Sequence, residues 1–213
     1  MKKKQKTNSN KKSKLSSGIL VLENGQVFRG IGLGHEGEAT GEVCFNTSIT
    51  GYQEIISDPS YSGQIINFTF PHIGNVGTNH EDLESDKIWT KGVIFNAEIT
   101  SPSNYRSLKN LDAWLKKNRI VGLTGIDTRS LTNFIRDKGA PKGTIEKRKN
   151  GKFNIKKLLN QSIKWQGLNG LDLAKNVTTR SIYNWNNLKT WKKGVGFEKN
   201  KKNIFNIVAI DYG

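Results

Sequence analysis

The dipeptide Asn24-Gly25, which lies between two strand-like runs, limits the possible folds of this chain more than any other short segment. The runs 18–23 and 26–31 are rich in aliphatic residues. An Asn-Gly pair between such runs favours a tight turn, because both residues tolerate the positive φ that the turn requires. The sequence therefore predicts that the ordered part of the chain begins with a β-hairpin.

Further strand-like segments fill the first half of the chain, and helical patterns dominate the second half. The strand-like segments are rich in Val, Ile and Phe and cover residues 41–47, 64–70, 92–99, 120–125 and 144–145. The helical segments carry apolar residues three or four positions apart and cover residues 107–118, 127–139 and 154–162. We expect Ser107 and Asp127 to be N-caps of the first two helices. Strands followed by helices indicate an α+β domain over residues 18–165.

The chain is strongly basic, with 34 Lys and Arg against 18 Asp and Glu and a formal net charge of +16. Much of the excess lies in residues 1–17, 142–157 and 189–202. These stretches are rich in Lys and poor in Arg, whereas base readout and stacking favour Arg and aromatic residues. We interpret them as solvated surfaces and residues 1–17 as a disordered tail. A basic nucleic-acid binder remains the weaker alternative.

Several classes of protein do not fit the sequence. No apolar run reaches the roughly 18–20 residues of a membrane span. The basic N-terminus has no apolar segment after it, so it is not a secretory signal. The single cysteine, Cys44, excludes an internal disulfide, and no Cys/His cluster has the spacing of metal ligands. We expect a cytoplasmic protein that binds no metal.

The last ten residues form an apolar run of a different kind. Residues 204–213 resemble a strand buried inside a parallel α/β sheet. A polar, Trp-containing stretch at residues 166–203 precedes this run and is interpreted as a linker. We therefore expect residues 204–213 to be the first strand of a second, truncated domain.

Four blocks resemble the small subunit of glutamine-hydrolysing carbamoyl-phosphate synthase. They appear in the order of that family and cover residues 41–61, 70–79, 125–132 and 167–175. The resemblance implies a β/β/α swivelling-type domain at residues 18–165, which docks on a large synthetase subunit. It also implies a linker, followed by the start of a class I glutamine amidotransferase α/β domain.

The resemblance also implies an activity for the complete subunit. That subunit hydrolyses L-glutamine and passes ammonia through a tunnel to the large subunit of a heterodimer, from which higher oligomers form. The large subunit binds ATP and Mg and makes carbamoyl phosphate from bicarbonate, ammonia and two ATP, for arginine and pyrimidine biosynthesis. This chain is expected to bind no cofactor, to contain no catalytic residue and to be inactive alone. A non-catalytic protein-binding module is the alternative.

Cys44 is the first candidate site residue, because a thiol can attack an amide carbonyl. Enzymes with an α/β sheet that use a side-chain nucleophile place it on a sharp strand-to-helix turn flanked by glycines. Val43 and Phe45 flank Cys44 instead, in the middle of a predicted strand. None of the three histidines can be paired with it from the sequence. We predict that Cys44 is a packing residue.

The segment Asp58-Pro-Ser60 is the second candidate. Pro59 favours a turn, Asp58 can accept a backbone hydrogen bond within it, and Ser60 then presents its hydroxyl beside the turn. By local sequence alone, the segment is a helix exit. The resemblance implies that Ser60 binds glutamine and that Asp58 lines the ammonia tunnel.

The glycine-containing segment at residues 74–77 lacks the Gly-Lys-Ser/Thr ending of a phosphate-binding loop, so no nucleotide site is predicted there.

Overall fold

A closed barrel of strands forms the centre of the structure, a computed structural model that describes residues 16–185, 187–199 and 205–213. Neighbouring strands follow the order β1-β2-β6-β5-β4-β3-β7, and β7 pairs with β1 to close the barrel. The strands are β1 Gly18–Leu22, β2 Val27–Gly34, β3 Gly37–Asn46, β4 Gln64–Phe68, β5 Gly92–Ile94, β6 Val121–Thr124 and β7 Lys142–Lys147. Of the predicted tail at residues 1–17, residues 1–15 lie outside the described part.

The β1–β2 hairpin confirms the prediction made from Asn24-Gly25. Gly25 has a φ of 87°, and the backbone N–H of Leu22 donates to the carbonyl of Gln26 at 2.9 Å. β4 pairs in parallel with β3 and β5, and β5 pairs in parallel with β6. Because parallel neighbours need crossover connections, helices lie between β3 and β4 and between β5 and β6. The mixed α/β composition is thus confirmed.

Aliphatic side chains fill the inside of the barrel. Leu20, Val43, Ile65 and Ile145 are fully buried there. Glycines supply the remaining space: a Cβ on Gly143 would lie 2.8 Å from Cγ2 of Val43 and close to two leucine side chains of β1. Small barrels commonly combine small and large residues in this way.

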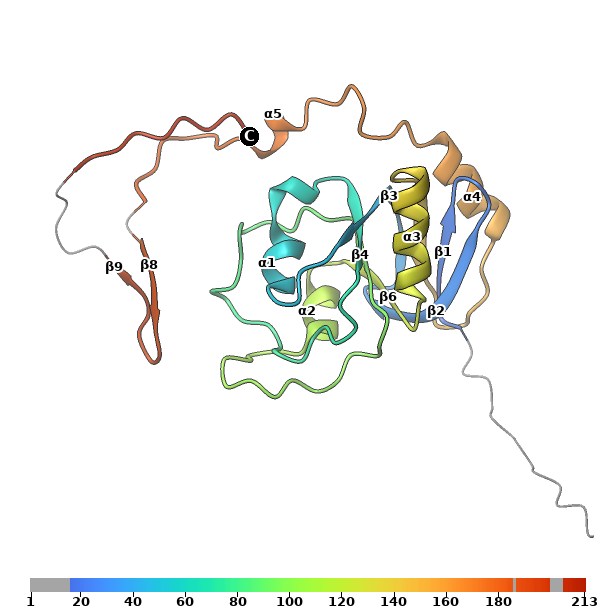
Figure 1. Cartoon of the computed structure of the whole chain (residues 1–213), viewed down its shortest axis with the longest axis horizontal. Helices are drawn as coiled ribbons and strands as arrows, with labels where there is room; N and C mark the ends of the chain where they lie inside the picture. The colour runs from blue at the N-terminus through green and yellow to red at the C-terminus, as the bar shows by residue number, and fades with distance from the viewer. Residues whose placement is uncertain (1–15, 186, 200–204) are drawn as a thin grey trace, which may run out of the picture.

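Helix α3, Thr128–Lys138, packs its apolar face onto this same cluster through Leu131 and Ile135 (Figure 1). The carboxylate of Asp127 caps the helix by accepting a hydrogen bond from the backbone N–H of Ser130 at 2.9 Å, and Gly139 ends it. Both helix ends therefore confirm the prediction for residues 127–139.

The outer faces of the strands are covered by two separate groups of helices (Figure 1). Helices α1, Tyr52–Ser57, and α2, Leu111–Lys117, pack with the outward side chains of β4 and β5 in one apolar cluster. Helix α4, Ile155–Lys164, covers β1, where Leu158 lies against Ile19 and Val21. Residues of β1 therefore alternate between the barrel interior and α4, so both faces of the strand are buried.

Helix α2 begins later than predicted. The sequence placed an N-cap at Ser107, but the cap is Asn110, whose side chain accepts from the backbone N–H of Ala113 at 2.8 Å. The preceding backbone is extended, because Thr78 and Lys109 form an isolated β-bridge. Leu108, which the helix predicted over residues 107–118 would include, is 63% exposed. A contact with a distant loop thus overrides the local helical pattern.

The segment predicted as a linker contains regular structure. It includes helix α5, Ala174–Val177, and an antiparallel hairpin formed by β8, Asn187–Lys192, and β9, Gly196–Lys199, which stands apart from the barrel sheet (Figure 1). Residues 205–213 form no strand within the described part, although the sequence predicts one there, and residue 204 lies outside that part. The expectation that residues 204–213 begin a second domain stays a prediction. A buried strand needs neighbouring strands, and the described residues supply none beside this segment.

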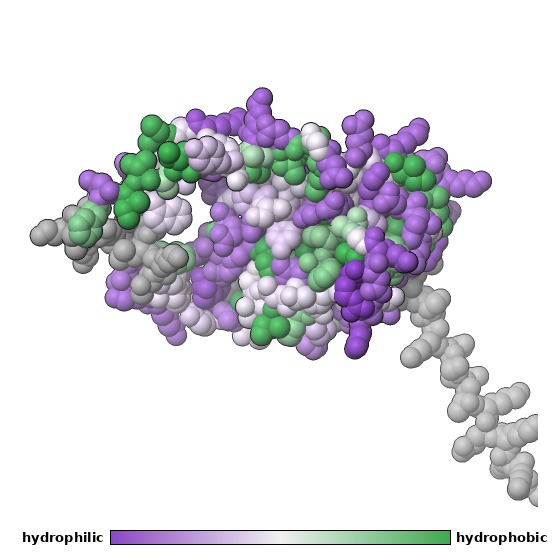
Figure 2. Space-filling view, turned by 45° about the horizontal axis from the view of Figure 1, so that its top comes forward, coloured by the Kyte–Doolittle hydropathy of each residue, from purple (hydrophilic) through white to green (hydrophobic). Residues whose placement is uncertain are grey.

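The side chains of this last segment are exposed. Phe205, Ile207, Val208 and Ile210 are each at least 73% exposed. Figure 2 shows hydrophobic surface on the arm that leaves the top of the molecule. Such a row of exposed apolar side chains is unusual on a folded surface, where contiguous apolar patches commonly mark an interaction site.

Candidate functional site

The Asp58-Pro-Ser60 segment forms the turn that the sequence predicts. Oδ1 of Asp58 accepts a hydrogen bond from the backbone N–H of Ser60 at 2.8 Å. Pro59 opens the short 3-10 helix η1, Pro59–Tyr61, where its fixed φ is favourable. Ser60 is exposed, and its hydroxyl forms no hydrogen bond within the described part of the chain. The turn therefore holds the backbone and leaves the hydroxyl of Ser60 accessible.

Helix α1 leads into this turn and is fixed by the loop that follows β4. The hydroxyl of Tyr52 donates to the carbonyl of Gly77. Gln53 and Asn79 exchange two hydrogen bonds, from Nε2 of Gln53 to the Asn79 carbonyl at 2.6 Å and from the Asn79 N–H to Oε1 of Gln53 at 2.9 Å. Since Gln53 is almost fully buried, these bonds lock α1 in place, and with it the start of the turn.

Gly74 and Gly77 allow the loop after β4 to pack closely against neighbouring segments. Both adopt left-handed backbone conformations, with φ of 94° and 77°. A Cβ on Gly74 would lie 2.7 Å from Cγ2 of Ile99, and a Cβ on Gly77 would collide with the side chain of Ser107. Close approach of neighbouring segments thus accounts for both glycines, without a bound phosphate. His72, in the same loop, is exposed.

Leu168, in the block 167–175, packs on Gly63 close to this turn. Gly63 directly precedes β4 and has a φ of 82°. A Cβ there would lie 2.7 Å from Cδ2 of Leu168. Leu168, in the block 167–175, therefore packs beside the turn that carries Ser60, on a glycine two residues after the end of the block 41–61.

Acidic groups lie close to α1. Burial raises the pKa of Glu54, and the negative charges of Asp82 and Glu84 raise it further. Glu84 is tied to the end of α1, because its backbone N–H donates to Oγ of Ser57 at 3.0 Å. Glu54 therefore keeps its proton to a higher pH than a solvated glutamate does.

Cys44 is not placed for catalysis. Its side chain packs against the apolar cluster between the barrel and helices α1 and α2. Burial raises the pKa of the Cys44 thiol to about 12, and the charge of Glu42 adds to this effect. The nucleophile in thiol chemistry is the thiolate, which this environment disfavours. The environment thus supports the prediction of a packing role.

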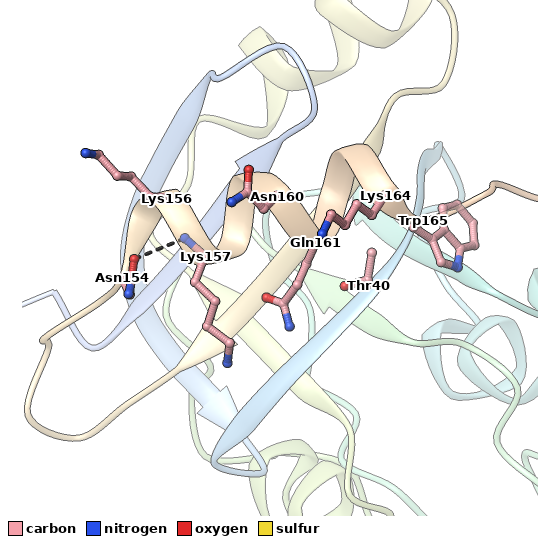
Figure 3. Close-up of a pocket in the computed structure, with 8 residues that line it drawn as sticks. All are labelled: Thr40, Asn154, Lys156, Lys157, Asn160, Gln161, Lys164 and Trp165. Atoms are coloured by element: carbon pink, nitrogen blue, oxygen red, sulfur yellow. Dashed lines mark hydrogen bonds between the residues drawn. The ribbon is translucent and has the colours of Figure 1, made fainter.

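The surface hollow beside α4 has a volume of about 710 Å³ and is lined in part by lysines (Figure 3). Lys157 is not free to bind an anion there, because its Nζ donates to both carboxylate oxygens of Glu38, at 2.8 and 2.7 Å. Gln161 donates to the same carboxylate at 2.8 Å. These bonds, that of Lys157 above all, lower the pKa of Glu38 against the effect of burial. The hollow is therefore bordered by an internal ion pair.

The described residues contain no group of three or more His, Cys, Asp or Glu side chains arranged to hold a metal ion. In the same part of the chain, no helix is both long enough and apolar enough to cross a membrane.

Sequence reasoning missed one cluster of contacts. Trp191 of β8 reaches Glu81 and Arg106, which lie in the loops on the α1 and α2 side of the barrel. The signal available in the sequence was Gly194-Val-Gly196 between Trp191 and Phe197, a turn between two aromatic residues.

These features define a mixed α/β barrel domain that presents an exposed serine on a rigid turn. A family model described as the carbamoyl-phosphate synthase small chain, CPSase domain, matches residues 20–145, more than half of the sequence. The chain belongs to the carbamoyl-phosphate synthase small chain family.

Curated relatives support the same assignment. The chain is 52% identical over 199 residues to the carbamoyl phosphate synthase small chain of Bradyrhizobium diazoefficiens, an alignment that covers 92% of this chain and 50% of the relative. It is 53% identical over 201 residues to the protein of the same name from Bartonella henselae, with 92% and 50% covered. The chain spans about half the length of the curated relatives it matches.

Proposed function

We propose that this chain is the N-terminal part of the small, glutamine amidotransferase subunit of carbamoyl-phosphate synthase. The complete subunit hydrolyses glutamine and supplies ammonia to the large subunit. The large subunit makes carbamoyl phosphate from bicarbonate, ammonia and two ATP, for arginine and pyrimidine biosynthesis in the cytoplasm. The family match over residues 20–145 carries the proposal. The identity of about half over almost the whole chain supports it.

The domain organisation is part of this proposal. Residues 18–165 dock on the large subunit as a swivelling-type domain, residues 166–203 connect, and residues 204–213 begin the amidotransferase domain. The exposed apolar side chains of Phe205, Val208 and Ile210 support this view, because burial by further protein would remove their apolar surface from water. ATP and Mg bind to the large subunit, and this chain binds neither.

Within this domain, Ser60 contacts glutamine bound mainly by the amidotransferase domain. Two observations support this role: the Asp58 carboxylate holds the backbone of Ser60, and the Ser60 hydroxyl is exposed. An exposed hydroxyl on a fixed backbone forms a hydrogen bond to a ligand at a small cost in conformational entropy. Asp58 is half-buried. In this proposal, its carboxylate lines the route taken by ammonia.

The proposal is tested with the complete subunit co-expressed with its large subunit. We expect carbamoyl phosphate synthesis from glutamine, bicarbonate and ATP, and no glutamine hydrolysis by residues 1–213 alone. A complete subunit that binds the large subunit but gives no glutamine-dependent synthesis would indicate a non-catalytic binding module instead.

A further inference from the structure

The aromatic side chain of Trp191 makes the main contact between the β8–β9 hairpin and the barrel domain. Nε1–H of Trp191 donates a hydrogen bond to Oε2 of Glu81 at 2.6 Å. The guanidinium carbon of Arg106 lies 4.4 Å from the centroid of the Trp191 ring, a cation–π distance. The ring of Tyr105 lies 6.4 Å from the same ring. Trp191 is thus held at its edge and over its face by residues far away in the sequence.

The acceptor side of this contact is held by interactions within the barrel domain itself. Arg106 forms ion pairs with Glu81 at 3.2 Å and with Asp82 at 2.7 Å. Asp82 in turn accepts a hydrogen bond from Nδ2 of Asn79 at 2.7 Å, and Asn79 is bonded to Gln53 of α1. A chain of hydrogen bonds therefore connects the Trp191 contact to the helix that leads to Ser60.

The turn of the hairpin also approaches the barrel domain. A Cβ on Gly196 would lie 2.6 Å from Oε1 of Glu81, and Gly196 has a φ of 81°. Nζ of Lys193 lies 4.9 Å from the centroid of the Tyr105 ring. Between the two parts lies a hollow of about 480 Å³, whose lining includes His80 and Leu108 on one side and Trp191 and Lys193 on the other. The contact therefore involves both a strand and the turn.

The hairpin depends on these contacts for its position. A two-stranded hairpin by itself is marginally stable in water. The β8–β9 hairpin pairs only with itself within the described residues, and the barrel sheet does not extend into it. The hydrogen bond from Trp191 to a carboxylate and the cation–π contacts of Trp191 and Lys193 thus anchor an otherwise separate hairpin.

We propose that Trp191, Glu81 and Arg106 form a clamp that holds the β8–β9 hairpin on the barrel domain and sets the path of the chain toward residues 205–213. Trp191 is then a positioning residue. This role rests on the proposed function, in which residues 204–213 begin the amidotransferase domain. A second contact joins the segments before and after the hairpin, because the backbone N–H of Thr179 donates to Oδ2 of Asp211 at 2.7 Å.

Amide hydrogen exchange on the 213-residue chain tests the clamp. In Trp191→Phe and in Glu81→Ala, we expect exchange in peptides from 187–198 to become about tenfold faster, since each variant removes the hydrogen bond to a charged group. Exchange in the barrel strands should stay unchanged. Because Glu81 lies outside the hairpin, its variant leaves the hairpin sequence intact.

Trp89→Phe is the matched control. Trp89 makes the same two kinds of contact, with Oγ of Ser85 at 2.9 Å and with Nζ of Lys87 at 3.9 Å from the ring centroid, but both partners lie in its own loop. This variant should leave exchange in 187–198 unchanged. Unchanged exchange in Glu81→Ala, or an equal acceleration in Trp89→Phe, would overturn the clamp.

A double variant sharpens the result. If Glu81 and Trp191 act through one contact, Glu81→Ala combined with Trp191→Phe should accelerate exchange no more than Trp191→Phe alone. Multiplication of the two separate effects would show that the two residues act independently, and would contradict the clamp.

The positioning role is tested in the complete subunit bound to the large subunit. We expect Trp191→Phe to raise the KM for glutamine severalfold and to leave the rate with free ammonia unchanged. Faster exchange with an unchanged KM would overturn the positioning role alone. The absence of glutamine-dependent synthesis in the unmodified complex would instead overturn the proposed function. The hydrogen-exchange data would still test whether the clamp holds the hairpin.

Discussion

Leu168 packs on Gly63 so closely that a Cβ at position 63 would lie 2.7 Å from its Cδ2 atom. Gly63 lies three residues after Ser60, directly before β4. The contact joins the segment after α4 to the turn that carries the candidate site. The site is therefore a product of tertiary packing as well as of its local turn.

Gly63→Ala should destabilise the chain more than Gly125→Ala. Both positions have left-handed φ, 82° and 74°, which costs a non-glycine residue about 1–2 kcal/mol. Only Gly63 is crowded, since nothing lies within 4 Å of a Cβ on Gly125. Because the crowding atom is the terminal methyl of a half-buried leucine, which can shift, overpacking should add about 1 kcal/mol at position 63, the low end of the range for cores. Urea unfolding of both variants measures the difference, and equal losses would contradict the Leu168 contact.

The corrected start of α2 gives a second prediction. Asn110→Ala should lower the free energy of unfolding by about 1 kcal/mol, because it removes the side chain that caps the helix. Ser107→Ala, at the position that the sequence favoured, should change it by less than about 0.5 kcal/mol. Thermal or urea unfolding distinguishes the two, and the reverse order would place the cap at Ser107.

The ion pair between Glu38 and Lys157 predicts a pH effect. Chiefly through its bond with Lys157, the folded protein lowers the pKa of Glu38 below 4.5, so the unfolded chain holds the proton to higher pH. The stabilisation is therefore present above pH 4.5 and is lost as pH falls through the lower, folded pKa. Glu38→Gln should remove this acid-dependent part of the unfolding free energy.

Lys157→Met should remove most of the same pH dependence, since it removes the partner of Glu38. At neutral pH, each variant should cost at most about 1 kcal/mol, because the pair is partly exposed. Stability curves measured from about pH 3 to about pH 7, a range that includes the ordinary glutamate pKa of about 4.3, test the assignment. An acid-induced loss that is unchanged in Glu38→Gln would assign the effect to other carboxylates.

The thiol of Cys44 should react slowly in the folded chain. Burial raises its pKa to about 12, so almost no thiolate is present at pH 8, a pH near the ordinary pKa of about 8.5. A thiol-specific reagent should modify the folded chain at least about a hundredfold more slowly than the urea-unfolded chain. In the complete subunit, Cys44→Ser should leave glutamine hydrolysis near wild type. Equal labelling rates would contradict the buried environment.

Local sequence signals predicted the elements whose ends are defined by their own residues. Asn24-Gly25 predicted the first hairpin, and Asp127 and Gly139 predicted both ends of α3. The signals failed where a distant segment decides the structure. The bridge between Thr78 and Lys109 shortens α2, and closure of the barrel depends on the pairing of β7 with β1 and β3.

The same difference between local and distant contacts applies to the candidate site. The hydrogen bond from the Ser60 N–H to Asp58 follows from three consecutive residues, so the sequence predicted it. The contact of Leu168 with Gly63 and that of Trp191 with Glu81 each connect segments about a hundred residues apart. No local pattern carries such information, because it arises only when the chain is packed.

The role of Ser60 in glutamine binding is tested most directly by Ser60→Ala in the complete subunit bound to its large subunit. Loss of one neutral hydrogen bond should raise the KM for glutamine about three- to tenfold. The rate with free ammonia should stay unchanged, and Ser130→Ala, which removes another exposed hydroxyl, should change neither value. A KM for glutamine in Ser60→Ala equal to that of the wild type would contradict the account.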